Sequence, residues 1–485
     1  MVNRITGTLL AVFLALPSGA QRILSLDSCR QMALSNNKQL GISKLKQGVA
    51  ANLRKSARTK YLPHVSAVGT YEFTSKPISL LSSEQQAEFS HLGTAFAGSI
   101  SQSLAPMMQQ DPKMAAVMGQ LGPTLETAMN GLGQKIVDAF DTDTRHVLAG
   151  SVMLTQPLFM GGSIVALNKM ADISEKLAEN STEARRQATI YRIDQAYWQV
   201  VSLHHKKKLA ESYRDLVKKL SGDVHKMIDE GVATKSDGLS VDVKVNEAEM
   251  TLTKVNDGLV LSRMLLNQLC GLPLNESVTL EDEQVENIAV VELTPELDVE
   301  RAVDNRPELK MLQNTVDLTK QTTNVLRAGH MPQLLLTGGY AVSNPNVLDG
   351  FQRKFGGFWH VGVMMRVPIW NWGDVMYKVR ASKGATSIAK LELEEARELI
   401  ELQVNQNTFK VDEANKKLVM AQSNIQRAEE NLRMANLGFS EGVITPATVM
   451  EAQTAWLQAN SQKIDAEIDV KLSQVDLQKA LGTLE

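Results

Sequence analysis

The sequence predicts a protein of the α+β class with an internal duplication, built from very long helices and a few short strands. Only 5% of its 485 residues are aromatic while 43% are hydrophobic, a balance that suits long helices better than several globular cores. The stretches 162–229 and 373–440 are almost free of proline and glycine, and each could form one helix of about 100 Å. The octets EGVATKSD (230–237) and EGVITPAT (441–448) follow these stretches.

The duplication is larger than the octets. A shift of 211 positions aligns QPLFMGGS (156–163) with VPIWNWGD (367–374). Nearer the N-terminus a shift of 269 aligns YLPHVSAVGTYEF (61–73) with HMPQLLLTGGYAV (330–342), so the first half carries 58 additional residues. Proline, glycine and tyrosine recurring at fixed spacing indicate an internal repeat.

The N-terminus is predicted to be a signal peptide at 1–20. Arg4 precedes an apolar stretch, and the small residues Ser18 and Ala20 fit a cleavage site before Gln21; a short buried helix is the alternative. Beyond it, no apolar run is long enough for a membrane helix. Two cysteines, Cys29 and Cys270, exclude a disulfide framework. We expect two inert thiols, with a single bridge as the alternative.

The remaining chain is divided into two repeats. Each is expected to contain a helix, a strand pair, a long helix, a turn and a returning helix. The first repeat is 21–270; its first helix is expected at about 26–60, beginning at Asp27, its insert at 78–140 and its tip at 230–237. An equatorial linker follows at 271–294. The second repeat is 295–485; its first helix is expected at about 295–330, beginning at Thr294–Pro295, its strand pair within 331–368 and its tip at 441–448.

Each octet is expected to turn between two antiparallel helices. Gly231 and Gly442 fit the left-handed position that follows a helix. Thr234 and Thr445 are expected to cap the returning helices, the second of which has proline at its first position. A helix kink is the alternative, but two copies at equivalent places favour a hairpin.

Stretches of about ten residues with alternating polarity predict the strands. Examples are HVSAVGTYEF (64–73), HVLAGSVMLTQP (146–157) and WHVGVMMRVP (359–368). Their length suits a strand that crosses a bilayer, although half-buried strands of soluble proteins alternate in the same way. If they cross a membrane, four strands are too few to close a barrel, which needs about eight. Copies of the chain must then share one barrel, and three copies supply twelve strands.

Composition and motifs argue against several function classes. With 51 basic and 54 acidic residues the net charge is −3, so no basic surface for nucleic acid is expected. HExxH, CxxC, phosphate-binding glycine loops and nucleophile elbows are absent from the sequence. The adjacent His204 and His205 lack the spacing of a metal pair, and we interpret them as part of a solvated helix face. We expect no catalytic activity, cofactor or metal.

Several segments together resemble the outer-membrane efflux protein family, the TolC-like channels. They are LSLDSCRQMALSNNKQL (24–40), QPLFMGG (156–162), EGVATKSDGLSV (230–241), EGVITPATVMEAQTAWLQA (441–459) and DLQKALGTL (476–484). The resemblance implies a homotrimer in the outer membrane of a Gram-negative bacterium. Its twelve-stranded transmembrane β-barrel, with four strands from each protomer, would continue into a long periplasmic α-helical barrel.

The resemblance also implies a function. The chain would be the outer-membrane exit channel of a tripartite efflux or type I secretion system. Its partners would be a periplasmic adaptor (membrane fusion) protein, an inner-membrane pump and outer-membrane lipid, with no nucleic acid. A soluble periplasmic coiled-coil scaffold or adaptor protein is the alternative, which osmotic release without detergent would reveal.

Site residues follow from the resemblance by position. The tips that would dock the adaptor contain Gly231, Val232, Thr234, Gly442, Val443 and Thr445. Family members narrow the periplasmic entrance with carboxylates six and nine residues after the second tip glycine, which here are Thr448 and Glu451. Thr448 departs from that pattern, and Asp237 holds the corresponding place in the first repeat. Exposed carboxylates without a role are the alternative.

The insert at 78–140 is expected on the extracellular side. Pro106, Pro112 and Pro123 are expected to break it into short helices, and disorder is the alternative. The corresponding loop of the second repeat, SNPNVLDGFQRKFGGF, is short. The tryptophans near the last strand resemble a membrane-edge aromatic girdle, although core packing would explain them equally. They are Trp359, Trp370 and Trp372.

Overall fold

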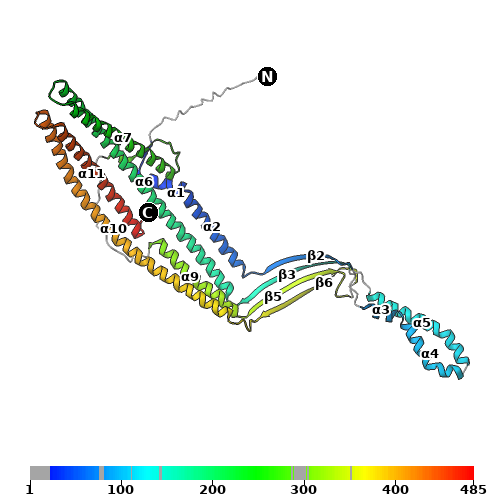
Figure 1. Cartoon of the computed structure of the whole chain (residues 1–485). Helices are drawn as coiled ribbons and strands as arrows, with labels where there is room; N and C mark the ends of the chain where they lie inside the picture. Colours follow the sequence, from blue (N-terminus) through cyan, green and yellow to red (C-terminus); the bar gives the residue numbers. More distant parts are fainter. Residues whose placement is uncertain are drawn as a thin grey trace, which may run out of the picture. The chain divides into compact units, whose positions relative to one another are not determined.

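The computed structural model comprises two compact units, each built from segments of both halves of the chain (Figure 1). The first contains residues 1–54, 170–320 and 382–485, and the second contains 55–169 and 321–381. The structure describes residues 22–75, 81–110, 112–140, 145–285, 288, 302, 305–349 and 352–484. The segment 1–20, interpreted as a signal peptide, lies outside the described residues.

Four helices dominate the chain. The two long helices, α6 (Ser163–Asp229) and α10 (Asp374–Ser440), each have 67 residues. The returning helices, α7 (Lys235–Cys270) and α11 (Pro446–Leu481), each have 36. The helix boundaries predicted from the scarcity of proline and glycine are confirmed. At 1.5 Å per residue, α6 and α10 are each about 100 Å long.

A seam of small and aliphatic residues runs along α10. Its buried positions recur mainly at intervals of seven, four and three residues, which is the spacing that lets two helices interdigitate over a long distance. They are Ser382, Ala389, Leu393, Ile400, Val404, Val411, Ala414, Leu418, Ala421, Ala428, Leu432 and Ala435. This spacing explains how a sequence poor in aromatic residues still builds a continuous core.

The first helix differs from the expectation. Instead of one helix at 26–60, the chain forms α1 (Leu26–Asn36) and α2 (Lys38–Thr59). Ser25 caps α1, and Asp27 lies within the first turn. The break occurs at Asn37, whose ψ of 114° is extended and whose Oδ1 accepts a hydrogen bond from the Leu40 amide at 3.0 Å. The Asn37 side chain therefore replaces the lost helical bond and caps α2.

The corresponding helix of the second half is shorter than expected. It is α9 (Pro307–Arg327), which a 3₁₀ turn, η2 (Ala328–His330), extends. The expected start at Thr294–Pro295 lies outside the described residues. Proline at the first position of α9 costs no hydrogen bond, because that amide has no partner within a helix.

A small parallel pair of strands was not predicted. Strand β1 (Arg22–Leu24) pairs with β4 (Val278–Leu280), and a 3₁₀ turn, η1 (Glu281–Gln284), follows. The fully buried thiols Cys29 and Cys270 lie in the same hydrophobic core as this pair. Both are present as thiols, so the expectation of two inert thiols agrees with the structure and that of a bridge does not.

The second unit contains an antiparallel sheet of four strands in the order β2-β3-β5-β6. The strands are β2 (His64–Phe73), β3 (His146–Met160), β5 (Gln333–Asn344) and β6 (Gly356–Arg366). They confirm the strands predicted from alternating polarity. A bulge between Pro157 and Phe159 shifts the register of β3 against β5, which accommodates proline in an inner strand.

The register sorts the side chains of the sheet onto two faces. Val65 lies opposite Leu154, Leu154 opposite Gly338, and Gly338 opposite Val361. Because directly opposed residues share a face, one face is apolar across all four strands. It carries Val65, Ala67, Tyr71, Phe73, Leu148, Val152, Leu154, Leu336, Tyr340, Trp359, Val361, Val363 and Met365, and the other carries Ser66, Thr70, Glu72, Ser151, Thr155, Thr337, Ser343, His360 and Arg366 among smaller and apolar residues.

Both strand-to-helix junctions have the same unusual backbone. Gly161 and Gly162 have φ of 64° and 86°, and Trp372 and Gly373 have φ of 53° and 81°. A Cβ at Gly161 would lie 2.8 Å from the Ala328 carbonyl oxygen, so only glycine fits there. Trp372 adopts a left-handed conformation that costs energy in a bulky residue.

The insert is helical. It forms α3 (Ser83–Ser90), α4 (Leu92–Gln110) and α5 (Pro112–Phe140). Of the three prolines expected to break helices, only Pro112 does so, at the start of α5. Pro106 and Pro123 lie inside helices, and the expectation for them was wrong. In the described part of the chain, no helix has the length and apolar character needed to cross a membrane.

Candidate functional site

The tips of the two helix hairpins end the long helices in the same way. Gly231 and Gly442 have φ of 80° and 71°. The Val232 amide donates to the Met227 carbonyl at 2.9 Å, and the Val443 amide donates to the Gly438 carbonyl at 2.8 Å. The glycine amides donate to the carbonyls of Ile228 and Phe439. This is the Schellman motif, and it confirms both predicted turns.

The two tips differ in how the returning helix begins. Thr234 and Asp237 form a reciprocal capping box, in which each side chain accepts a hydrogen bond from the backbone amide of the other. Thr445 occupies the cap position of α11 but makes no capping hydrogen bond; its Oγ1 lies 3.2 Å from Thr448 Oγ1. Pro446 at the first position presets the backbone instead.

Asp237 therefore has a local structural role that our sequence interpretation missed. Its Oδ2 accepts from the Thr234 amide at 3.0 Å and from the Thr234 hydroxyl at 2.7 Å. These hydrogen bonds from Thr234 lower the pKa of the Asp237 carboxyl below its ordinary value. The signal was present in the sequence, because threonine followed three residues later by an acidic residue indicates a capping box.

Each tip displays one exposed valine. Val232 is 67% exposed and Val443 is 81% exposed. Both occupy the same position of the Schellman motif. Next to the valines, Ile228, Phe439 and Ile444 pack against a buried hydrophobic cluster, which holds both turns in place. Each tip therefore presents its exposed valine on a well-defined turn.

The two entrance candidates on α11, Thr448 and Glu451, are both exposed. Further exposed residues follow Glu451 at intervals of 7, 11, 14 and 18 residues. Because these intervals are close to whole turns of about 3.6 residues, the exposed residues form a stripe along one face of α11. The stripe contains Gln458, Gln462, Asp465 and Asp469. The structure therefore places Glu451 in line with two further carboxylates that the sequence interpretation did not single out.

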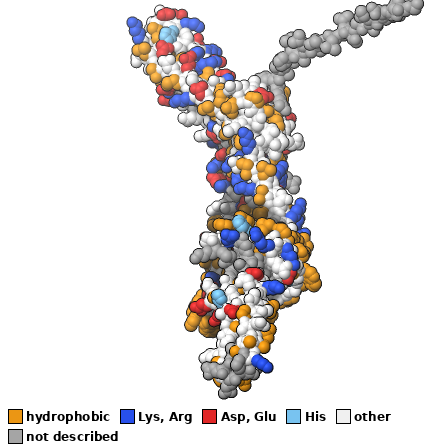
Figure 2. Space-filling model, turned by 90° about the vertical axis from the view of Figure 1, so that its right-hand side faces the viewer, with side chains coloured by type: hydrophobic (Ala, Val, Ile, Leu, Met, Phe, Trp, Pro, Cys, Tyr) orange, Lys and Arg blue, Asp and Glu red, His pale blue; other side chains and the backbone are white. Residues whose placement is uncertain are grey.

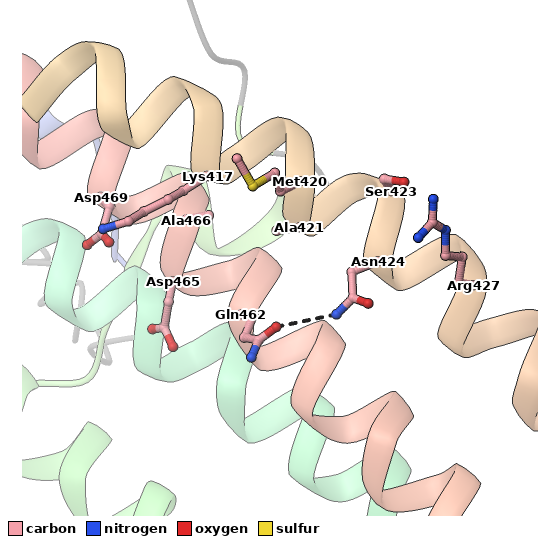
Figure 3. Close-up of a pocket in the computed structure, with 10 residues that line it drawn as sticks. All are labelled: Lys417, Met420, Ala421, Ser423, Asn424, Arg427, Gln462, Asp465, Ala466 and Asp469. Carbon is pink, nitrogen blue, oxygen red and sulfur yellow. Dashed lines mark hydrogen bonds between the residues drawn. The ribbon is translucent and has the colours of Figure 1, made fainter.

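A groove of about 610 Å³ lies beside this stripe, between α10 and α11 (Figure 3). Asn424 Nδ2 donates across it to Gln462 Oε1 at 3.4 Å. Lys417 and Arg427 approach from α10, while Asp465 and Asp469 project from α11 (Figure 3).

The carboxylate of Asp469 in the groove is partly shielded from water. Burial is the main cause that raises the pKa of Asp469, and the nearby Asp465 carboxylate adds to it. Lys417 and Lys206 act in the opposite direction. Lys206 also forms an ion pair with Asp465 at 2.6 Å, so this groove is polar and close to balanced in charge.

The adjacent histidines are half-buried, which corrects their interpretation as a solvated face. His204 Nδ1 lies 3.5 Å from a Glu283 oxygen, and His205 Nε2 lies 3.4 Å from the Asp282 carbonyl. Burial lowers the pKa of both imidazoles. Their neighbours belong to η1, so they connect α6 to that segment. Within the described ranges, no group of three or more His, Cys, Asp or Glu side chains could hold a metal ion.

Comparison with known sequences gives a consistent result. The sequence model of the family described as "Outer membrane efflux protein" matches residues 299–483. "Outer membrane protein TolC" of Vibrio cholerae serotype O1 is 22% identical over 419 residues, which covers 81% of this chain and 93% of that protein. "Outer membrane protein TolC" of Escherichia coli K12 is 23% identical over 177 residues, covering 35% of this chain and 36% of that protein.

Solved structures share the fold. The outer-membrane channel OprN has a TM-score of 0.73 at 15% identity, covering 94% of this chain and 90% of that one. VceC of Vibrio cholerae has a TM-score of 0.72 at 13% identity, covering 94% and 96%. The open state of MtrE of Neisseria gonorrhoeae has a TM-score of 0.71 at 15% identity, covering 95% and 89%.

Long helix hairpins and a sheet of four strands give this chain the fold of the TolC-like outer-membrane channels. The chain is similar to the outer membrane efflux protein family over residues 299–483, and to a TolC protein over most of its length. It is an exit channel of efflux systems that lies in the outer membrane and extends into the periplasm, and it is a transport protein rather than an enzyme. The scaffold alternative is thereby set aside.

Proposed function

We propose that three copies of this chain form one channel, with a shared β-barrel of twelve strands above a shared α-helical barrel. In this proposal the channel receives substrates from a periplasmic adaptor protein and an inner-membrane pump, as part of a tripartite efflux or type I secretion system. The observation that carries the proposal is the sheet, which has two open edges and one continuous apolar face.

The edges of the sheet require partners in lipid. Strands β2 and β6 lie at the two edges, and each unpaired backbone amide or carbonyl in a bilayer costs several kcal/mol. Four strands are fewer than the roughly eight of the smallest single-chain barrels. Pairing β6 of one copy with β2 of the next around a threefold axis satisfies every edge.

The faces of the sheet support the same arrangement. All ten residues of β2 are exposed within one chain, and on the apolar face Val65, Tyr71 and Trp359 are each at least 65% exposed. Lipid would contact this apolar face, while the serines, threonines and charged residues of the other face would line the lumen. Alternation of this kind is typical of transmembrane barrels.

The helices also present apolar surface that neighbouring copies would cover. The exposed apolar residues include Leu239, Val243, Met250, Leu261 and Leu265 on α7, and Leu391, Leu399, Leu402, Phe409, Met420, Met434 and Leu437 on α10. Lateral packing of three copies would bury these residues and extend the seam into a tube. Because the chain is duplicated, the hairpin of α6 and α7 and the hairpin of α10 and α11 would occupy equivalent positions in the wall of the tube.

We assign the adaptor contact to the tips and the entrance to α11. Val232 and Val443, held by the turns at Gly231 and Gly442 and the caps at Thr234 and Thr445, form the docking surface. Glu451 of three copies would form a ring of negative charge at the entrance, where Thr448 adds no charge. Asp237 would contribute beside its capping role.

Detergent extraction followed by light scattering tests the assembly. We expect the protein to require detergent and to have three times the mass of the mature chain. Thr70→Cys on β2 combined with His360→Cys on β6 should cross-link neighbouring copies with a short bis-maleimide, since the native thiols are buried. Ser151→Cys on the inner strand β3, tested alone, is the control without such links. A monomer in the aqueous fraction would refute the proposal.

A further inference from the structure

The helical insert between β2 and β3 has a surface that the channel proposal leaves unexplained. Its helices α3, α4 and α5 follow Phe73 and precede His146, whereas β5 and β6 are joined by the short segment 345–355. Only the first half of the chain carries this element. A channel of three copies would therefore have three such hairpins at the same end of the barrel.

The contact between α4 and α5 is made by small and polar residues. The Gly93 amide donates to Asn130 Oδ1 at 2.8 Å, and Thr94 Oγ1 donates to Glu126 Oε1 at 2.8 Å. A Cβ at Gly93 would lie 2.2 Å from the Glu126 carbonyl oxygen. The helices therefore approach backbone to backbone here, and Val137, which is 9% exposed, is a buried apolar residue on this side of α5. The other large apolar side chains of α5 are more exposed.

Those large side chains form a stripe on the opposite side of α5. Its members are Val117, Leu121, Leu125, Leu132 and Ile136, which are 37–58% exposed. At about 3.6 residues per turn, all five fall within an arc of about 100°. Glu126 and Asn130, which contact α4, project from the other side of the helix. Polar groups therefore make much of the contact with α4, while the apolar stripe is exposed.

Few charges surround the α5 stripe. Helix α4 contains no charged residue, and of the four on α5, Lys113 and Lys135 border the stripe while Glu126 and Asp138 lie away from it. Figure 2 shows hydrophobic side chains (orange) exposed on the viewed face, interspersed with charged ones (blue and red). Apolar surface of this kind on a soluble hairpin marks an interaction site.

We propose that the α5 stripes of three copies pack against one another and close the outer mouth of the channel. The proposal rests on the trimer proposed above. The occupant is a second and third copy of this chain, because three hairpins tethered to one rim meet at an effective concentration on the order of 1 mM. No other partner would be held at that concentration by the chain itself.

The spacing within the stripe supports a bundle of helices. Leu121 and Leu132 are 11 residues apart, as are Leu125 and Ile136. An interval of 11 residues corresponds to almost whole helical turns, so the stripe follows α5 with little drift and suits helices that pack nearly straight. Such a bundle would lie on the channel axis and narrow the exit.

Cross-linking at the stripe tests the contact. Leu121→Cys and Leu132→Cys, tested one at a time in the detergent-solubilised full-length protein, should link two copies with a short bis-maleimide. Thr127→Cys is the matched control, since it is exposed on another face of α5. A trimer without links at either stripe position would overturn the bundle and leave the trimer standing. Absence of a trimer would overturn the proposed function itself.

Single-channel conductance tests the closure. Leu121→Asp combined with Leu132→Asp should repel the hairpins and raise the conductance of the protein in planar bilayers, while the detergent-extracted protein remains a trimer. Gln120→Asp combined with Thr127→Asp places the same charge off the stripe and should leave conductance unchanged. Equal conductance in both double variants would show that the hairpins do not close the mouth, for instance because the stripe faces lipid.

Discussion

Gly231 and Gly442 impose a backbone requirement that side-chain packing does not. No atom lies within 4 Å of a Cβ added at either position, so substitution is opposed by conformation alone. We expect Gly231→Val to destabilise the first tip by about 1–2 kcal/mol, the cost of the left-handed conformation for an L-residue. Hydrogen exchange of the Val232 and Ala233 amides measures this cost.

The matched control at this position is asparagine. Gly231→Asn should lose much less protection, since asparagine tolerates the left-handed region. If valine and asparagine accelerated exchange equally, the turn would depend on the absence of a side chain and not on its backbone conformation.

The capping box at Thr234 and Asp237 makes the first tip sensitive to acid. The folded pKa of Asp237 is below the ordinary 3.8, so its contribution to stability is present above that value and is lost as pH falls through the folded pKa. Thr234→Ala should cost the start of α7 about 1 kcal/mol. Hydrogen exchange across α7 between neutral and acidic pH checks both effects.

The second tip is an internal control for the acid effect. Thr445 makes no capping hydrogen bond and Thr448 replaces the acidic partner, so the start of α11 should keep its protection at the pH where α7 loses it. Equal loss at both tips would show that acid acts on the whole molecule and not on this capping box.

Sequence reasoning at the residue scale succeeded where one residue decides the geometry. Gly231, Gly442 and Thr234 were predicted in their roles because glycine and capping residues act through their own backbone or their nearest amides. The break at Asn37 was missed because asparagine is also common inside surface helices. Only the hydrogen bond from the Leu40 amide shows that Asn37 starts a helix.

At the scale of elements, composition and periodicity predicted the helices and strands, but the sequence did not predict which strands pair or in which register. The lengths of α6 and α10 followed from the scarcity of proline and glycine. The pairing of β3 with β5 joins residues almost 200 positions apart along the chain, and nothing in a local pattern specifies it. The prolines of the insert misled because neighbouring apolar residues favour helix on both sides of each.

The two faces of the sheet predict opposite responses to charge. Val152→Lys places an ammonium on the apolar face, and it should destabilise the barrel by about 2–4 kcal/mol if the position lies near the bilayer centre. Ser151→Lys places it on the other face and should be tolerated. The yield of detergent-resistant trimers after refolding into lipid measures the difference. Equal loss in both variants would contradict the assignment of the apolar face to lipid.

At the scale of the whole molecule, the stripe of exposed carboxylates on α11 predicts that the proposed channel entrance prefers cations. Glu451→Gln should remove three charges from the entrance of a trimer and lower its preference for cations, which the reversal potential in a salt gradient reports. Glu430→Gln is the control, because Arg433 pairs with this carboxylate at 2.7 Å. An equal shift in both variants would exclude a special role for Glu451.

The class of protein was accessible from the sequence because a duplicated plan of long helices and ten-residue strands is distinctive. The proposed assembly rests on counting strands, since four strands are too few to close a barrel. The packing inside the insert was not accessible, because glycine and polar residues make its contact where apolar residues would have been expected.

The open edges of the sheet have a consequence for biogenesis. A newly exported copy carries two bare strand edges before it meets its sisters, and such edges readily pair in the wrong register with whatever extended segment comes first. In the proposed trimer, completion of the barrel and entry into the bilayer must therefore occur as one coupled event, and any delay between them favours aggregates over channels.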